Sequence, residues 1–149
     1  MRNDNEQYCV TVRDVKEGQF DAIQRSIEKG SGGIHGVLSE ALIESAVARA
    51  YCGYFPEIWQ KAAVLLQGIS KNHGFVDGNK RAATHAMMTL LSKSGYALVN
   101  DDPTEEQQKE LEDVIVAVAD SKMTLEELMN WIRVRLVPSE RYKDVIFHS

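Results

Sequence analysis

One stretch of this 149-residue chain concentrates side chains that could do chemistry together, residues 73–81, HGFVDGNKR. Lys80 and Arg81 are adjacent cations, one a point charge and the other a planar fork that suits phosphate oxygens. Asp77 suits a Mg²⁺ ion that accompanies nucleotide phosphates better than it suits bare phosphate. His73 is able to take a proton from an incoming hydroxyl near neutral pH. These residue types predict a site that binds phosphates and assists proton transfer.

A loop that runs into a helix must position these groups. The turn signal of residues 77–79 is followed by apolar residues at helical spacing from Arg81 onward. A helix is therefore expected to begin near Asn79, and its first amides lack intrahelical partners and carry the positive end of the helix dipole. Gly78 lets the backbone come close to a ligand, so these amides and the two cations should form a phosphate cradle. Phe75 is expected to point inward and anchor the loop.

Each of these residues also has an explanation without function. A single histidine before a turn is most often a surface or capping group, and Asp-Gly-Asn is most often only a turn. Two cations on a first helical turn are usually solvated. The combination in this order is what favours a functional site.

The stretch resembles the signature of the Fic/Doc family: His, any residue, Phe, any residue, Asp or Glu or Ala, Gly or Ala, Asn, Gly or Lys, and Arg. The matching residues are His73, Phe75, Asp77, Gly78, Asn79, Lys80 and Arg81. Lys80 stands where typical Fic enzymes have a second glycine and Doc proteins have lysine, so the chain resembles the Doc branch. The resemblance extends over about residues 32 to 100.

The resemblance implies that, with Mg²⁺, a phosphate-containing group moves from ATP to a hydroxyl of a target protein. It makes His73 the general base and Asp77 the Mg²⁺ ligand. The nucleotide phosphates would be held by Gly78, Asn79, Lys80 and Arg81. Lys71 lies where Doc proteins carry a basic residue and is a further nucleotide-binding candidate; its alternative is a solvated lysine that interacts favourably with the helix dipole.

The residue at position 80 indicates whether AMP or the γ-phosphate of ATP is transferred. The glycine of Fic enzymes leaves room for an ATP that donates AMP, whereas lysine fills that space, and Doc proteins are associated with an inverted nucleotide that donates its γ-phosphate. The resemblance therefore favours a kinase-type toxin of a toxin–antitoxin system. Its target would be a cytosolic protein such as elongation factor Tu, and translation would halt. The alternatives are an AMP transferase and a catalytically silent helical interaction module.

A missing sequence pattern predicts a partner. Fic proteins that inhibit themselves carry Ser or Thr followed four residues later by Glu and then by Gly or Asn, and no such run occurs here; Thr124, for example, is followed at that distance by Leu128. Arg81 therefore lacks an internal inhibitory partner, and a separate antitoxin protein is expected. We expect it to fold as a helix into an apolar groove around Phe20, Ile23 and Leu42.

Composition limits the classes of function. At 149 residues, with 44% hydrophobic and 26% charged residues, the chain is expected to form one soluble domain, residues 1–149. A net charge of −5 argues against direct nucleic-acid binding and against anionic membrane surfaces. No window reaches the apolar length of a membrane span, so a cytoplasmic protein is expected. Cys9 and Cys52 lack CxxC spacing and are expected to be reduced, buried thiols.

Hydrophobic periodicity and capping residues predict a compact all-α bundle of about six helices, with the motif helix central and the signature loop and helix at residues 73–95. The expected helices lie between Asp14 and Gly30, Ser39 and Cys52, Pro56 and Ser70, Asn79 and Gly95, Asp102 and Val118, and Thr124 and Pro138. Residues 8–12 are either a short strand or extended chain, and residues 96–99 are a short extended piece. The Fic/Doc resemblance implies the same helical architecture.

Overall fold

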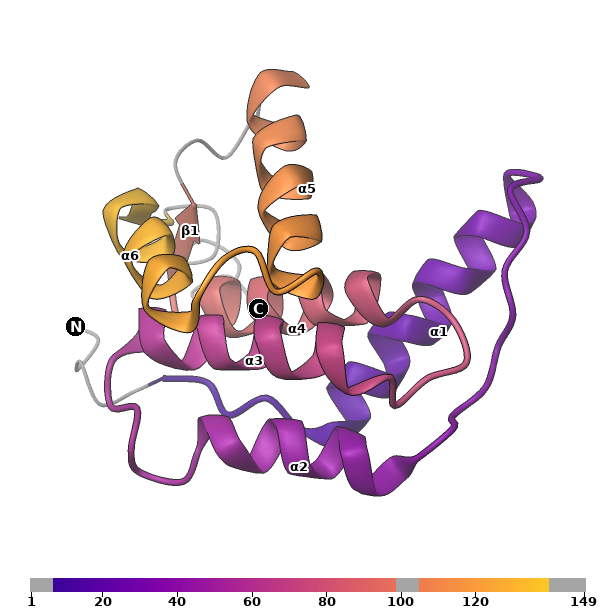
Figure 1. Ribbon diagram of the computed structural model, residues 1–149, viewed down its shortest axis with the longest axis horizontal. Helices are drawn as coiled ribbons and strands as arrows, with labels where there is room; N and C mark the ends of the chain where they lie inside the picture. The colour runs from indigo at the N-terminus through magenta and orange to yellow at the C-terminus, as the bar shows by residue number, and fades with distance from the viewer. Residues whose placement is uncertain (1–6, 99–104, 140–149) are drawn as a thin grey trace, which may run out of the picture.

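The computed structural model describes residues 7–98 and 105–139, and this part of the chain holds six helices and a two-stranded sheet (Figure 1). The elements are α1 (Val12–Glu28), α2 (Glu40–Ala50), α3 (Ile58–Asn72), α4 (Asn79–Lys93), β1 (Tyr96–Leu98), α5 (Glu105–Ala119), α6 (Leu125–Arg135) and β2 (Leu136–Pro138). The predicted helical fold class is confirmed.

Helices α3 and α4 form the centre of the fold, with α2 on one side and α5 and α6 on the other (Figure 1). Residues 62–66 of α3 are all fully buried, because α2, α4, α5 and α6 all contact this helix. A helix that is apolar all round belongs in the interior. Helix α4 buries Ala82, Ala83, Ala86 and Met87, whose mostly small side chains allow close packing against α1 and α3. The predicted central position of the motif helix is confirmed.

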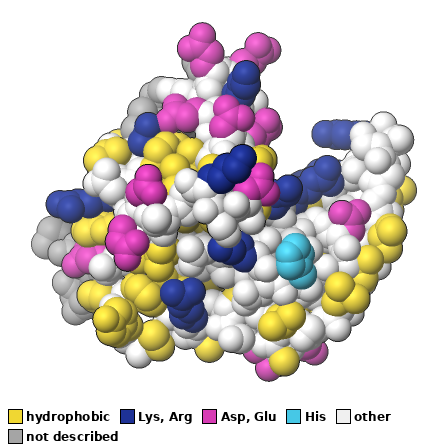
Figure 2. All heavy atoms as spheres, in the orientation of Figure 1, with side chains coloured by type: hydrophobic (Ala, Val, Ile, Leu, Met, Phe, Trp, Pro, Cys, Tyr) yellow, Lys and Arg dark blue, Asp and Glu magenta, His cyan; other side chains and the backbone are white. Residues whose placement is uncertain are grey.

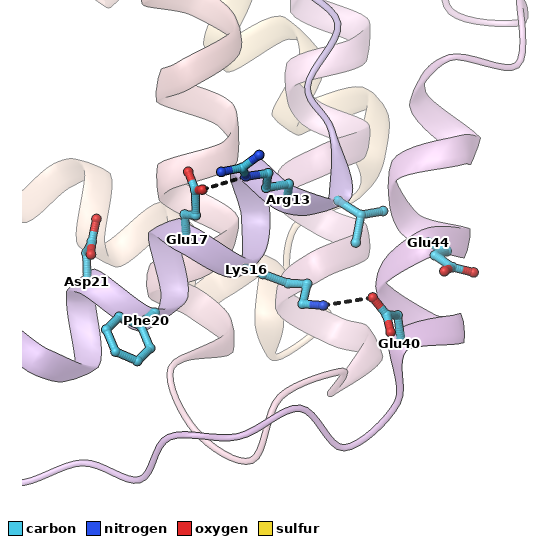
Figure 3. A pocket seen from close by; sticks show the side chains of 8 residues that line it. Arg13, Lys16, Glu17, Phe20, Asp21, Glu40 and Glu44 are labelled. Atoms are coloured by element: carbon cyan, nitrogen blue, oxygen red, sulfur yellow. Dashed lines mark hydrogen bonds and ion pairs between the residues drawn. The ribbon is translucent and has the colours of Figure 1, made fainter.

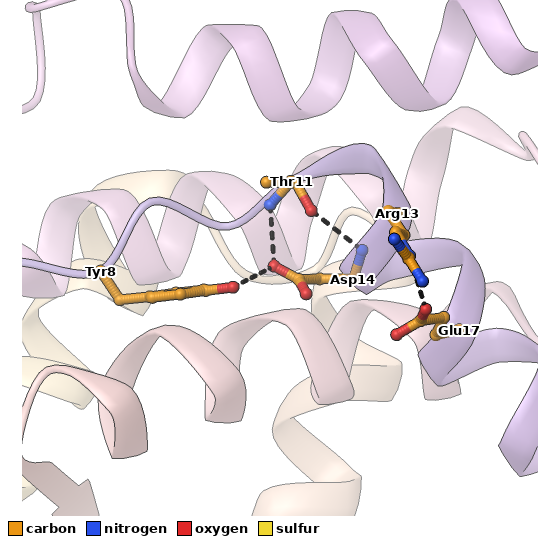
Figure 4. Close-up of polar contacts among 5 residues, drawn as sticks. All are labelled: Tyr8, Thr11, Arg13, Asp14 and Glu17. Carbon is orange, nitrogen blue, oxygen red and sulfur yellow. Dashed lines mark hydrogen bonds and ion pairs between the residues drawn. The ribbon is translucent and has the colours of Figure 1, made fainter. Parts of the chain in front are cut away.

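The start of α1 differs from the prediction. Its cap is Thr11, and Asp14 is the third helical residue, whose carboxylate accepts the N–H of Thr11 at 3.0 Å while the hydroxyl of Thr11 accepts the N–H of Asp14 at 3.1 Å (Figure 4). Thr and Asp both cap helices, and their reciprocal bonds fix the start at the earlier residue. Ser39 caps α2 and Thr124 forms the expected capping box of α6.

Residues 8–11 are extended chain, one of the two forms expected for residues 8–12, and pair with no strand of the described chain. Two smaller expectations were wrong. Pro56 precedes α3 instead of starting it, because Glu57 takes the cap position in a box with Gln60. Cys9 and Cys52 are free, as expected, but exposed. The expected start of the fifth helix at residues 102–103 lies outside the described residues. None of the described helices combines the length and apolar character that a membrane crossing needs.

The small sheet joins two distant parts of the chain. Strands β1 and β2 are antiparallel, with Tyr96 opposite Pro138 and Leu98 opposite Leu136, and the N–H of Ser139 continues the pairing by donating to the carbonyl of Gly95 at 2.9 Å. The extended piece at residues 96–99 was predicted. Its partner was not, because β2 follows α6 without a break and continues its apolar spacing.

Tyr51 fastens the segment before α1 to the core. Its hydroxyl accepts the N–H of Val10 at 2.8 Å and donates to the carbonyl of Tyr8 at 3.2 Å, and the N–H of Tyr8 donates to the Ser94 hydroxyl at 2.9 Å. Burial raises the pKa of Tyr51 to about 12. Val10, 1% exposed, is thereby held in the core.

Replacing Tyr51 by Phe is expected to lower the free energy of unfolding by about 1–3 kcal/mol, because the buried N–H of Val10 loses its partner. Urea denaturation measures the change. Tyr54→Phe is the matched control, since Tyr54 is 80% exposed, and it should change stability by less than about 0.5 kcal/mol. Equal losses in the two variants would contradict the role given to Tyr51.

Asp14 makes the stability of α1 depend on pH. Partial burial alone would raise the pKa of its carboxyl, but hydrogen bonds from the Thr11 N–H and the Tyr8 hydroxyl outweigh this and leave the pKa below its usual value (Figure 4). A carboxyl whose pKa is lowered by folding stabilises the fold above the pKa it has in the unfolded chain, and this contribution is lost as pH falls through the lower, folded-state pKa.

Asp14→Asn is therefore expected to cost about 1 kcal/mol at neutral pH, and its deficit relative to the parent should shrink below about pH 4. Urea denaturation of both proteins at several pH values measures this. Asp21→Asn, at an exposed position of the same helix, is the control. A deficit that stays constant down to acid pH would show that the charge of Asp14 is not involved.

Candidate functional site

The loop between α3 and α4 is fixed by the backbone of the segment that precedes α2. The carbonyl of Gly74 accepts the N–H groups of Leu38 and Ser39 at 2.8 and 3.0 Å, and Val37 and Phe75 form an isolated antiparallel bridge. Phe75 is 1% exposed, so the expectation that it points inward is confirmed. The loop is therefore attached on two sides, by its buried phenyl ring and by backbone hydrogen bonds.

Asn79 closes this loop with its side chain. Its Oδ1 accepts the N–H of Phe75 at 3.0 Å, and its Nδ2 donates to the carbonyl of the same residue at 3.1 Å. The sequence predicted Asn79 as a phosphate-binding residue and gave no sign of this clamp. Because the side-chain amide is engaged within the loop, what Asn79 can offer a ligand is its backbone N–H.

Asp77 is held in a definite orientation. One oxygen of its carboxylate accepts the N–H of Gly78 at 2.8 Å, and the other accepts the N–H of Ile34 at 3.1 Å. Its carbonyl accepts Nε2 of Gln19, a glutamine that is only 3% exposed, at 2.9 Å. Segments from α1, from the linker before α2 and from the loop itself thus fix the position of one carboxylate.

Asp77 is not part of a ready-made metal cage. The described residues contain no group of three or more His, Cys, Asp or Glu side chains that could hold a metal ion. Mg²⁺ does not need such a cage, because it is commonly bound by one or two carboxylates together with substrate phosphates and water. Asp77 therefore fits a Mg²⁺ ion that arrives with a nucleotide.

Helix α4 begins at the predicted residue and its N-terminus is open. Gly78 is the cap residue, in a left-handed conformation with φ 76°, and it supplies no side chain to the first amides. A Cβ on Gly78 would lie 3.0 Å from Cδ1 of Ile23, so any other residue would have to displace that side chain and adopt a strained φ. Lys80 and Arg81 follow on the first turn and are exposed. The two cations thus lie beside the uncapped amides, and phosphate binding by this group stays a prediction.

His73 ends α3 with an unusual backbone conformation. It has φ 52° and ψ 44°, a left-handed geometry that glycine adopts most readily and asparagine, aspartate and histidine more often than other residues. Its side chain is exposed and has no hydrogen-bond partner among the described residues. A left-handed residue commonly ends a helix, so this conformation terminates α3 and turns the chain into the loop.

Lys71 and His85 have other contacts. The amine of Lys71 donates to the hydroxyl of Ser121 at 2.6 Å and so connects the last turn of α3 with the turn between α5 and α6. It would have to leave this bond to reach a phosphate. His85 lies against α1, where a Cβ on Gly18 would come 2.1 Å from the imidazole Cδ2. His85 is nevertheless exposed at the surface.

Fold and site together define a class of protein: an all-helical domain whose loop between two central helices presents an oriented carboxylate, an exposed histidine, uncapped helix amides and two cations. The model of the Fic/DOC family matches residues 6–91, and the chain belongs to this family.

Among curated proteins, Toxin Doc of Mycolicibacterium smegmatis is 41% identical to the chain over 75 residues. The match covers 47% of this chain and 58% of the relative, so the chain spans less than two thirds of the relative's length. The resemblance to the Doc branch, predicted from the lysine at position 80, is confirmed by this similarity.

Proposed function

We propose that the protein is a toxin that transfers the γ-phosphate of ATP to a hydroxyl of a cytosolic protein such as elongation factor Tu, and so halts translation. The observation that carries this proposal is the loop from His73 to Gly78, in which an exposed histidine and an oriented carboxylate directly precede an uncapped helix N-terminus. The similarity to a protein named Toxin Doc supports the toxin assignment.

Each group has a role in this reaction. His73 accepts the proton of the target hydroxyl, whose oxygen forms a bond to the γ-phosphorus while the bond between that phosphorus and the β–γ bridging oxygen breaks. ADP leaves with that oxygen. Asp77 holds Mg²⁺, which neutralises charge on the phosphates. The first amides of α4, with Lys80 and Arg81, bind the phosphate oxygens and stabilise the charge that spreads over them in the transition state.

The choice between phosphate transfer and AMP transfer rests on Lys80, whose charged side chain occupies the first turn of α4 where a glycine would leave space. Incubation of the protein with Mg²⁺, purified elongation factor Tu and either γ-labelled or α-labelled ATP tests the proposal. Label from the γ-position on the target supports the kinase, and label from the α-position supports an AMP transferase instead. If neither label is transferred to elongation factor Tu or to any protein of a whole cytosolic extract, the result supports the catalytically silent interaction module.

We propose further that a separate antitoxin covers the hollow between α1 and α2. This hollow has a volume of about 550 Å³, and Phe20 lies at it with 54% of its surface exposed (Figure 3). Apart from Phe20 and Val12, its lining residues are charged. The groove expected from the sequence also included Leu42 and Ile23, and neither lines this hollow. Leu42 is 40% exposed elsewhere on α2, and Ile23, at 1% exposure, is packed inside against Gly33 and Gly78.

Expression of this chain alone is expected to arrest growth, and co-expression of the adjacent small open reading frame should restore it. Phe20→Asp should keep the toxicity but lose the rescue, since it places a charge where an apolar helix face would bind. Tyr54→Asp, at an exposed position in the segment between α2 and α3 and outside the hollow, is the matched control and should still be rescued. Growth curves under induction measure both. Harmless expression of the soluble parent chain would contradict the toxin assignment.

A further inference from the structure

A second hollow, the α1–α5 cleft, adjoins the cradle and has no role in the reaction described so far. It has a volume of about 870 Å³ and is formed by α1, α4 and α5, with Lys80 and Arg81 among the residues that line it. Figure 2 shows it between α1 and α5, with Lys and Arg side chains gathered along it. Sites for small organic ligands commonly have volumes of about 300–1,000 Å³.

The lining of this cleft is strongly basic. Arg25 in the last turn of α1 and Lys29, the C-cap of this helix, join the two cations of α4. Among the described residues, Glu112 of α5 is the single carboxylate in the lining. None of the four cations forms an ion pair within residues 7–98 and 105–139. This concentration is local, because the whole chain has a net charge of −5. Four cations that face one carboxylate repel one another, and a bound polyanion relieves that repulsion.

The cleft also has an apolar wall. Leu111 and Ile115 of α5 face it, as does Met88 of α4, which is 37% exposed. A ligand that fits both parts carries several negative charges at one end and a flat apolar group at the other. This is the chemistry of a nucleoside polyphosphate.

We propose that Arg25 and Lys29 bind the phosphate donor, which extends from the cradle into the α1–α5 cleft, with its base against the apolar wall of α5. The inference rests on the proposed function and assigns to α1 a part of the nucleotide site outside the signature segment. His73 and Asp77 do not line the cleft, whereas Lys80 and Arg81 do. An ATP molecule that reacts at the loop and also fills the cleft therefore passes over the first turn of α4. Arg25 and Lys29 would then bind the phosphate groups that the residues of the cradle do not contact.

The test measures nucleotide binding directly, by calorimetry of ATP, ADP, AMP and adenosine on the full chain in a His73→Ala background, in which turnover is prevented. Arg25→Gln combined with Lys29→Gln should weaken ATP binding by about 10- to 100-fold and adenosine binding by less than about 2-fold. Glu112→Gln should strengthen ATP binding by about 2- to 5-fold. The matched control is Arg13→Gln with Lys16→Gln, on the same helix but outside the cleft, and it should bind ATP like the parent.

The alternative is that Arg25 and Lys29 only stabilise the C-terminal end of α1 through its dipole, in which case the double variant melts lower but binds ATP unchanged. That result overturns the inference and leaves the proposed function intact. A parent chain that binds no nucleotide overturns both. If the double variant does not fold, Glu112→Gln provides the test. A gain in affinity for ATP but not for adenosine supports a polyphosphate in the cleft. An unchanged affinity for ATP overturns the inference.

Discussion

His73→Ala is expected to lower the rate of phosphate transfer by about 10²- to 10⁴-fold, because the target hydroxyl loses the group that accepts its proton. The affinity for ATP should change little, since the phosphates are held by α4 and not by the imidazole. Single-turnover transfer of γ-label from ATP measures the rate, and calorimetry measures the affinity. In cells the variant should be soluble and no longer arrest growth.

The left-handed backbone at position 73 calls for a second variant. Alanine tolerates left-handed geometry less well than histidine, so a stability effect must be separated from a chemical one. His73→Asn provides this separation, because asparagine tolerates left-handed geometry and cannot act as a base at neutral pH. Both variants should melt near the parent temperature and be equally inactive. Transfer by His73→Asn at the rate of the parent would exclude the histidine as general base.

Asp77→Asn is expected to reduce transfer by about 10²-fold or more, because it removes the anionic ligand of Mg²⁺, whose charge stabilisation of a phosphoryl transition state is worth several kcal/mol. Asparagine retains one oxygen that can accept the N–H of Ile34, so the loop should keep its shape better than with alanine. Initial rates as a function of Mg²⁺ concentration should show that the variant needs far more metal, and removal of the metal with a chelator should stop the parent.

A matched control separates this effect from a general loss of negative charge. Asp113→Asn, at an exposed position of α5, alters net charge equally and should leave the Mg²⁺ dependence unchanged. The metal-binding role of Asp77 would fail if Asp77→Asn reached the parent rate at the same Mg²⁺ concentration as the parent.

The helices could be predicted because their signals are local. The capping residues Ser39 and Thr124 and the start of α4 at Asn79 depend only on neighbours within a turn. Strand β2 could not be predicted, because Leu136–Pro138 is extended only through its pairing with β1, far away in the sequence. The cap of α1 was placed wrongly because two capping residues lie within one turn, and local preference does not rank them.

The composition of the site could be predicted but not the way it is held. Residue types and spacing pointed to the histidine, the carboxylate and the cations, which lie in one segment of sequence. The bonds that orient Asp77 come from Ile34 and Gln19, which are distant in sequence and of types that indicate no function by themselves. For the same reason the sequence did not indicate Arg25 as a binding residue. An arginine in the last turn of a helix is ordinary, and only the structure shows that it lines a cleft with α4 and α5.

The position of α6 and β2 has a consequence for the synthesis of the protein. The side chains of Leu128 and Ile132 are fully buried against the centre of the fold, and β2 pairs with the strand that follows α4. A growing chain on the ribosome releases residues 73–81 well before these elements, so α3 and α4 first emerge with one apolar side uncovered. Until residue 138 has left the ribosome, the two helices that meet at His73 and Gly78 lack part of their support. The proposed site is therefore expected to reach its final shape only after α6 and β2 have packed onto α3 and β1.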